Sequence, residues 1–457
     1  MITPAEHSRR PRVLQLSYAC SPIRGSEAGV GWHRAVQSAR HFDTWVICEE
    51  HEFAAEIREY LDAHGEVPGL NFVFVPIDQR EWSWGQWHDF IWYAVLRRWH
   101  CRAYEAARRL HERIGFNLVH QVTFCGYREP GYLWKLDAPF VWGPIGGTQN
   151  YPWRFLPYAG IGGALKEACR SVANILQLRF SPRVRRAAQK AALILAANST
   201  NQRNFARIHG ITPPTLPDVG IDSVPGAPRE PRRQGPLRIL WSGLLVHHKA
   251  LHLLIRALAR LPDDIPYELR VLGKGPLKRR WQRLAERTGV AKHTTWMGWL
   301  SHHEALEQLA WAEAFVFSSL RDTTGTVVLE ALGAGVPVIC LDHQGVHDLV
   351  TDECGLKIAV TSPRDVVARL SEAIGRLAGD HQQWARLSRG AIERARDYHW
   401  SRREVEMAEW YRRVIEGSLH GKAQPLPSMD FELRRPEAHR LQSAGLARAT
   451  STHTTAK

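Results

Sequence analysis

The chain lacks the short motifs that mark several common enzyme classes. No Gly-x-Gly-x-x-Gly follows the first predicted strand, which argues against a dinucleotide-dependent oxidoreductase. No Gly-x4-Gly-Lys-Ser/Thr occurs either, so a P-loop nucleotide-binding domain is excluded. No two of the seven cysteines stand as Cys-x-x-Cys, and their odd number, with several in apolar runs, predicts buried free thiols in a reducing compartment.

Long hydrophobic runs are also missing. No apolar stretch approaches the ~18 residues that a membrane-spanning helix needs. The short stretch 13–21 after Arg9-Arg10 has no cleavage signature, so we interpret it as a first strand rather than a signal peptide. We therefore expect a cytoplasmic protein, with peripheral binding to the inner face of the plasma membrane kept open.

Acidic residues are fewer than basic ones, 46 against 60, and the formal net charge is +14. Such a balance favours a polyanionic neighbour, either nucleic acid, an anionic membrane or a phosphorylated substrate. No nucleic-acid module is visible and the charge is scattered over predicted helices, so no nucleic-acid partner is expected.

Buried-strand patterns alternate with helical ones along the first half, at 12–19, 44–50, 71–77, 117–124, 139–147 and 191–199. We expect a helix from about Val30 after the first strand. Residues 212–236 are rich in Pro, Gly and charge, as linkers are. A second series follows at 237–243, 267–273, 294–300, 314–320 and 336–342. Alternating strands and helices predict parallel sheets, so the fold class is α/β with two Rossmann-like domains.

We divide the chain accordingly. The predicted units are a first Rossmann-like domain (1–215), a linker (216–236), a second Rossmann-like domain (237–400), a C-terminal helix (401–420) and a disordered tail (421–457).

The segment DTTGTVVLE (322–330) is the strongest chemical signal. It joins a predicted strand to a helix, and free backbone N–H groups at a helix start bind anions. Gly325 lets the backbone approach a phosphate closely. Glu330 lies on the helix, where its carboxylate can accept hydrogen bonds from vicinal hydroxyls, and Asp322 precedes the loop. A capping charge at Asp322 and a solvated Glu330 form the plainer alternative.

This segment resembles the Glu-x7-Glu signature of retaining glycosyltransferase family 4, with the following run EALGAGVPV (330–338). Asp322 replaces the first glutamate of that signature. The segment 239–261 resembles the family's donor-phosphate region, in which Lys249 contacts the diphosphate, while Leu244 stands where the family has an arginine. The resemblance covers roughly 12–418, is stronger in the second half, and implies a GT-B fold whose C-terminal helix crosses back to the first domain.

The resemblance also implies the site residues. The expected catalytic residues are Lys249, Asp322, Glu330 and His120. The expected donor-binding residues are Gly25, Ser26, Glu27, Gly243, Lys249, Gly273, Gly298, Gly325, Thr326, Val327 and Glu330. His120 carries the alternative of a structural histidine, since Val122 interrupts the family's His-x-His. Ser301 and Glu304 predict a helix capping box, and the pairs at 247–248 and 302–303 are interpreted as surface histidines.

The implied reaction moves a sugar from a nucleotide-sugar donor to a saccharide or lipid-linked saccharide, with retention of configuration, in cell-surface polysaccharide synthesis. No Asp-x-Asp triplet is present, so we expect no metal and no other cofactor. Two alternatives stay open, a nucleotide-sugar epimerase on the same fold and an inactive GT-B binding protein.

Two segments bear on the membrane. Residues 154–190 carry eight basic side chains against one acid, interleaved with apolar ones, and 82–99 holds five Trp. Basic amphipathic segments with aromatic anchors favour an anionic membrane surface, so we expect peripheral binding through the first domain. A solvated helix face and a Trp-rich core are the alternative interpretation.

Overall fold

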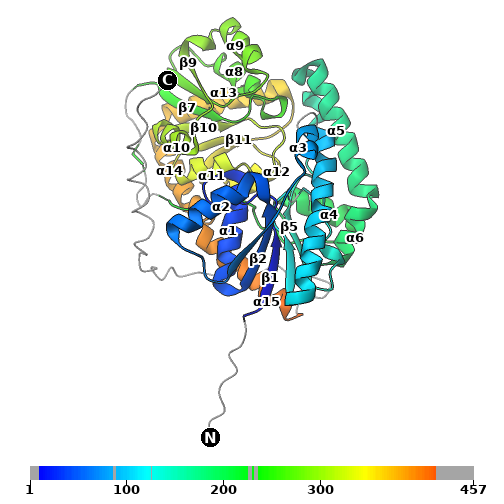
Figure 1. Cartoon of the computed structure of the whole chain (residues 1–457). Helices are drawn as coiled ribbons and strands as arrows, with labels where there is room; N and C mark the ends of the chain where they lie inside the picture. Colours follow the sequence, from blue (N-terminus) through cyan, green and yellow to red (C-terminus); the bar gives the residue numbers. More distant parts are fainter. Residues whose placement is uncertain (1–9, 86–88, 125, 225–228, 231–234, 418–457) are drawn as a thin grey trace, which may run out of the picture. The chain divides into compact units, whose positions relative to one another are not determined.

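The computed structural model describes residues 10–85, 89–124, 126–224, 229–230 and 235–417 (Figure 1). The predictions about Trp87, Cys125, the side chain of Trp84 and a tail over 421–457 concern parts of the chain outside the described residues. Two six-stranded sheets form the framework, one in each half of the chain.

The first sheet has the order β3-β2-β1-β4-β5-β6, and each printed pair of neighbours is parallel. Its strands are β1 (Arg12–Leu16), β2 (Asp43–Glu49), β3 (Leu70–Val75), β4 (Leu118–Gln121), β5 (Phe140–Ile145) and β6 (Ala191–Ala196). The strand order reverses at β1 and β4. In such sheets, ligands bind beyond the carboxyl ends of the strands at that reversal.

The second sheet repeats the plan in the order β12-β11-β10-β7-β8-β9, again parallel. Its strands are β7 (Leu237–Ser242), β8 (Tyr267–Leu272), β9 (Thr294–Gly298), β10 (Ala314–Phe317), β11 (Val338–Leu341) and β12 (Gly355–Ile358). The strands predicted from the sequence did not include β12. Its four residues are only half apolar and follow the charged turn 351–354, so the hydrophobic pattern is weak there.

Helices connect the strands in both halves. Those of the first half are α1 (Ser26–His41), α2 (Glu50–His64), α3 (Gln79–Gly85), α4 (Asp89–Ile114), α5 (Gly160–Phe180), α6 (Pro182–Lys190) and α7 (Ser199–His209). Those of the second half are α8 (Leu251–Leu258), α9 (Lys278–Arg287), α10 (His302–Trp311), α11 (Thr326–Gly333), α12 (Gln344–Leu349), α13 (Pro363–Gly379), α14 (His381–Arg396) and α15 (Trp400–Ile415). Short 3-10 turns include η2 (Trp153–Ala159) and η3 (His247–Lys249).

Local signals explain several helix starts. Ser301 and Glu304 form the predicted capping box at the start of α10. Glu49 ends β2 and accepts hydrogen bonds from the N–H groups of His51 and Glu52, which starts α2. The first helix was predicted to begin near Val30, but it begins at Ser26, with Gly25 as its cap. The expected Gly-Ser-Glu loop is therefore the first turn of a helix.

The core of the first half contains much of the tryptophan. Trp99 is fully buried and its indole donates to the carbonyl of Val75, while Trp82 and Trp92 pack edge to face beside it. Tyr18 contacts both Trp92 and Trp99. Trp99 is a core residue, and Trp82 and Trp92 are partly buried against the same core, which favours the alternative of a Trp-rich core.

The C-terminal helix α15 returns to the first half, as expected. Gln37 of α1 donates to the carbonyl of Trp400 at 2.8 Å, and Arg34 donates to the carbonyl of Arg403 at 3.2 Å. Tyr411 is fully buried and hydrogen bonds Gln15 of β1. The helix therefore joins a segment of the second half to the first sheet (Figure 1).

Candidate active site

The loop between β10 and α11 holds the strongest sequence motif. Gly325 caps α11 with φ of +83°, a left-handed conformation that favours glycine, and a Cβ there would lie 3.3 Å from Phe317. Thr326 and Val327 form the first turn of α11, whose free N–H groups begin at this point. Glu330 lies one turn further along the same helix. The motif therefore forms a strand, a tight loop and a helix start, as its sequence indicates.

Lys249 is the last residue of η3, in the loop that follows the carboxyl end of β7. Its ammonium group forms a short ion pair with Asp322. Ser318 donates to the carbonyl of Lys249 at 2.9 Å, and the indole of Trp241 donates to Ser318 at 3.0 Å. The structure thus brings together two predicted catalytic residues that are 73 positions apart in sequence.

Three predicted glycines lie at the carboxyl ends of β7, β8 and β9. Gly243 donates to the carbonyl of Leu272 at 3.0 Å, and Gly273 donates to Gly298 at 2.6 Å. A Cβ on Gly273 would lie 1.9 Å from the carbonyl oxygen of Gly243, so only glycine fits. These turns lie at the same sheet edge as Lys249 and Asp322, where parallel sheets bind ligands.

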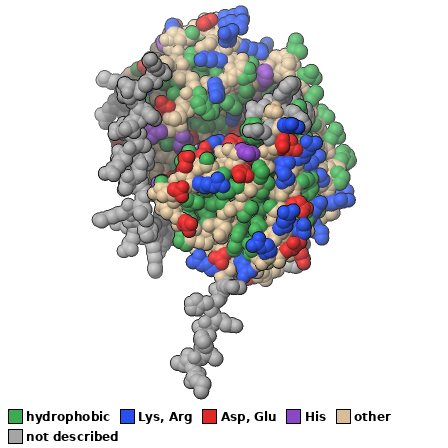
Figure 2. Space-filling model, viewed as in Figure 1, with side chains coloured by type: hydrophobic (Ala, Val, Ile, Leu, Met, Phe, Trp, Pro, Cys, Tyr) green, Lys and Arg blue, Asp and Glu red, His purple; other side chains and the backbone are tan. Residues whose placement is uncertain are grey.

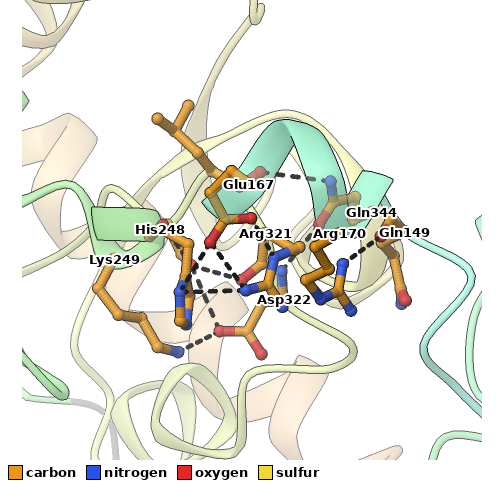
Figure 3. A network of polar contacts seen from close by, with 10 residues as sticks. Gln149, Glu167, Arg170, His248, Lys249, Arg321, Asp322 and Gln344 are labelled. Carbon is orange, nitrogen blue, oxygen red and sulfur yellow. Dashed lines mark hydrogen bonds and ion pairs between the residues drawn. The ribbon is translucent and has the colours of Figure 1, made fainter. Parts of the chain in front are cut away.

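A network of charged side chains joins this edge to the first half of the chain (Figure 3). Arg321 donates two hydrogen bonds of 3.1 Å to Glu167 of α5, and His248 lies 3.7 Å from the same carboxylate. Burial raises the pKa of Glu167, but interactions with His248 and Arg321 outweigh it and lower the pKa to about 2. Glu167 is therefore a buried carboxylate whose charge is held by the second half.

Gln344 continues the network on the other side of Asp322 (Figure 3). It accepts a 2.8 Å hydrogen bond from the N–H of Asp322 and donates to the carbonyl of Asn150 at 3.0 Å. A cavity of about 450 Å³ adjoins Gln344. Its polar lining comes from both halves and includes Thr148, Asn150, Arg203, Asn204, His343 and Gln344. The two halves therefore share a cleft next to Asp322.

The Gly25 segment approaches the second half at His302. A Cβ on Gly25 would lie 3.8 Å from the His302 ring, and the same ring lies 3.1 Å from a carboxylate oxygen of Glu330. Glu27 accepts a hydrogen bond from the N–H of Phe124 at 2.5 Å. His302 was interpreted as a surface residue. It is half exposed, but it links two predicted donor-binding segments, which nothing in its local sequence indicated.

His120 was predicted as a catalytic residue, with a structural histidine as the alternative. It is fully buried, and its ring nitrogens contact the hydroxyl of Tyr411 and the carbonyl of Gly143. Burial lowers its pKa to about 3, so the ring is neutral. Both ring nitrogens have partners in the protein's own core, which favours the structural alternative for His120.

The expectation of buried cysteines holds only in part. Cys101 and Cys169 are exposed, although Cys20, Cys48, Cys340 and Cys354 are buried free thiols as expected. Within the described residues, no group of three or more His, Cys, Asp or Glu side chains is arranged to hold a metal ion. The helices of the described part are also too short or too polar to cross a bilayer.

Comparison with known proteins bears on the second half. Residues 227–391 match the family model described as Glycosyl transferases group 1. This match contains Lys249, Asp322, Gly325 and Glu330. The first half, which holds Gly25 and Glu167, lies outside it.

Curated relatives match part of the chain. The glycogen synthase of Mycobacterium tuberculosis (strain H37Rv) is 32% identical over 225 residues, which cover 48% of this chain and 52% of that protein. The putative colanic acid biosynthesis glycosyltransferase WcaL of Escherichia coli (strain K12) is 28% identical, over 34% of this chain and 40% of that protein. The chain thus spans about half the length of the curated relatives it matches, or less.

Solved structures match almost the whole fold. Sucrose-phosphate synthase from Thermosynechococcus elongatus superposes with a TM-score of 0.61 at 16% identity, covering 89% of this chain and 100% of that one. HepE of Anabaena, solved with UDP and glucose, has a TM-score of 0.57 at 16% identity, covering 88% and 99%. These likenesses confirm the predicted GT-B arrangement of two Rossmann-like domains.

Proposed function

We propose that the protein is a retaining, metal-independent glycosyltransferase that moves a sugar from a nucleotide-sugar donor to a saccharide. The observation that carries this proposal is the meeting of Lys249, Asp322 and the start of α11 at one sheet edge, inside the region that matches group 1 glycosyl transferases. Relatives named for glycogen, colanic acid and lipopolysaccharide synthesis favour a role in polysaccharide synthesis at the cell surface.

The donor diphosphate would lie between Lys249 and the N–H groups of Gly325 and Thr326. A cation and a helix start together offset the charge that develops on the leaving diphosphate. Glu330 would accept the ribose hydroxyls, and Asp322 would orient the sugar. Both carboxylates have protein partners: Asp322 pairs with Lys249, and Glu330 pairs with His302. A bound donor would replace or share these partners.

The reaction would break the bond between the sugar C1 and a diphosphate oxygen. The acceptor oxygen would attack C1 from the same face, and its proton would pass to the departing phosphate oxygen. No side chain is needed as a nucleophile in this scheme. The polar cavity at Gln344, which neighbours Asp322, offers hydrogen-bonding side chains for a saccharide acceptor.

The arginine that the resembled family has near the diphosphate is absent from this chain. Leu244 takes that position and is 46% exposed. Arg321 is a cation of the same network as Lys249, held at present by Glu167 (Figure 3). We therefore include Arg321 in the proposal as the second positive charge near the diphosphate.

The remaining part of the proposal is that the first domain binds an anionic membrane surface and that the acceptor is a lipid-linked saccharide. Helix α5 has an outer face of exposed apolar side chains, which we call the α5 face: Ile161, Leu165, Val172, Ile175, Leu176 and Phe180. Figure 2 shows hydrophobic side chains with Lys and Arg beside them along the edge where α5 lies. Exposed Arg179, Arg185 and Arg186 add positive charge that suits anionic lipids.

The test of the proposed activity is incubation with a panel of nucleotide sugars, with UDP-glucose first, followed by mass spectrometry. Transfer to a saccharide or release of the sugar supports the glycosyltransferase. Conversion of the donor to an isomer of equal mass, separated by chromatography, supports the epimerase. Donor binding without turnover supports the inactive binding protein.

A further inference from the structure

A second cavity lies on the outer side of the second half, away from the proposed donor residues, none of which lines it. Its volume is about 410 Å³. It lies between η2, α8 and α9, and its lining includes Tyr158, His252, Arg256, Arg280, Arg283 and Arg287. The proposed function makes no use of this cavity.

Four arginines around one cavity form an unusual concentration of positive charge. Among the residues that the structure describes, no acidic side chain forms an ion pair with Arg256, Arg280, Arg283 or Arg287. Arg280, Arg283 and Arg287 are exposed and Arg256 is half-buried, whereas Arg183 and Arg321 are each paired with a buried glutamate, Glu129 and Glu167. Like charges in a shared cavity repel, and an anion in that cavity would remove the repulsion.

The position of these side chains is set by the packing of α9. Arg280, Arg283 and Arg287 are spaced by three and four residues, so they lie on one face of the helix. Trp281 and Ala285 are buried and hold α9 against the core, and Trp281 also lines the cavity. Figure 2 shows Lys and Arg side chains gathered over α9. The three guanidinium groups therefore stand on a rigid support.

The opposite wall supplies a fourth cation and two rings. Arg256 of α8 stacks over the ring of Tyr158, with 5.2 Å between the guanidinium carbon and the ring centre. His252 is buried, and its Nε2 atom has no hydrogen-bond partner among the described residues. Burial, together with the charges of Arg256 and Arg280, lowers the pKa of His252 to about 3, so the ring stays neutral. These groups can hydrogen bond and stack, and they bring no negative charge.

We infer that this cavity binds a ligand that carries two or more phosphate groups, separately from the donor site. Guanidinium groups bind phosphate oxygens through paired, charge-assisted hydrogen bonds, which suits several arginines acting on one ligand. A soluble diphosphate and the headgroup of a phosphorylated lipid share this chemistry. Arg280 also lies next to Gly160, the first residue of α5, so the cavity adjoins the start of the α5 face.

The test measures binding of inorganic pyrophosphate by titration calorimetry. Because pyrophosphate would also bind the donor site, the protein carries Lys249→Ala, which removes one of the two proposed donor-site cations and weakens binding there. We expect saturable binding that persists in this variant. Adding Arg280→Gln and Arg283→Gln should weaken it by about tenfold or more, since each loses charge-assisted hydrogen bonds. Arg279→Gln is the matched control, since Arg279 is exposed on the same helix and does not line the cavity.

Absence of saturable binding in the Lys249→Ala protein would overturn the inference, as would equal weakening by Arg279→Gln. Thermal melting checks the fold of the Arg280→Gln, Arg283→Gln protein, whose melting temperature should not fall, because like charges are removed. These results do not depend on glycosyltransferase activity, so a failure here and a failure of the proposed function remain distinguishable.

A second arm identifies the source of the phosphate. Vesicles of phosphatidylcholine with cardiolipin, whose headgroup has two phosphates, are compared with vesicles of phosphatidylcholine alone. If lipids supply the ligand, the double variant cosediments with cardiolipin vesicles less than the Arg279→Gln control does, and pyrophosphate competes. If the double variant loses pyrophosphate binding but cosediments as the control does, the ligand is soluble. Both results support a phosphate site at these arginines.

Discussion

Glu330 combines a sequence motif with a partner that its sequence does not reveal. It lies on α11, and His302 of α10 occupies one of its oxygens in the absence of a donor. Replacing Glu330 with Ala should leave the fold intact and weaken donor binding by about 2–4 kcal/mol, the cost of losing charge-assisted hydrogen bonds. Calorimetry with UDP-glucose measures this loss. Glu307→Ala, an exposed position on α10, should bind as the wild type does.

Lys249 is expected to act on the leaving group. Loss of a preorganised positive charge should lower the turnover rate by about 10²–10³ in Lys249→Ala, with activity unaffected by a chelator. Lys292→Ala removes an exposed lysine of the same half and should keep the wild-type rate. Turnover is followed with and without EDTA, and strict dependence on a divalent ion would contradict the scheme.

The His302–Glu330 pair predicts a pH-dependent contribution to stability. The hydrogen bond and charge of Glu330 raise the pKa of His302 above its ordinary value of 6.5. A raised pKa in the folded state means that the contribution is complete below pH 6.5 and is lost as the pH rises through the raised value. The melting temperature of His302→Ala should therefore fall below that of the wild type at about pH 5 and approach it at about pH 9. A constant difference across this range would argue against the pair.

At the scale of elements, α5 serves two purposes. Its inner side carries Glu167 to the second half, and its outer side is the α5 face. Two of the basic residues counted in the sequence have partners within the protein: Arg170 of α5 donates to the carbonyl of Gln149, and Arg183 of α6 pairs with Glu129. Leu178 is also buried, so it does not belong to the outer face.

The membrane prediction follows from this division. Leu165→Gln with Leu176→Gln should reduce cosedimentation with anionic vesicles, because burial of each leucine is worth about 1.5–3 kcal/mol. Arg179→Glu, Arg185→Glu and Arg186→Glu should reduce it further at low salt, by about 1 kcal/mol for each charge. Leu306→Gln, an exposed leucine of α10, is the control. If the wild-type protein does not cosediment with anionic vesicles, this part of the proposal is wrong.

At the scale of the molecule, the Glu167–Arg321 ion pair joins the two halves. The side chain of Glu167 is 3% exposed and that of Arg321 is 19% exposed. Removing one partner of a buried pair leaves the other charge uncompensated, so Glu167→Ala should destabilise the protein by about 3–5 kcal/mol. Glu105→Ala breaks an exposed pair with Arg108 and should change stability by less than about 1 kcal/mol. Equilibrium unfolding in urea at neutral pH compares the two.

The Glu167–Arg321 pair also predicts how its contribution to the free energy of unfolding changes at acid pH. The pKa of Glu167 is about 2, below its ordinary value of 4.5. A depressed pKa means that the stabilisation is present above pH 4.5 and is lost as the pH falls towards 2. The difference between wild type and Glu167→Ala should therefore shrink over this interval, and a difference that persists at pH 2 would contradict the assignment.

The sequence by itself determined the two Rossmann-like domains, the places of most strands along the chain, and the motif that contains Asp322, Gly325 and Glu330, with Lys249 upstream of it. These features depend on local periodicity, turn residues and short spacings, which a linear pattern records. The capping box at Ser301 is of the same kind. The start of α1 was placed too late, because Gly25 and Ser26 resemble a loop until the helix is seen.

Only the tertiary structure decided which of these residues have partners. Glu167 and Arg321 are 154 positions apart, and His120 and Tyr411 are 291 apart. His302 contacts Glu330 across 28 positions and two elements. Such pairs form because separate strand ends meet at a sheet edge and α15 crosses back over the first sheet. Residue type and neighbours along the chain carry no record of that proximity, so the burial of His120 and the cluster of four arginines at the second cavity became visible only in the fold.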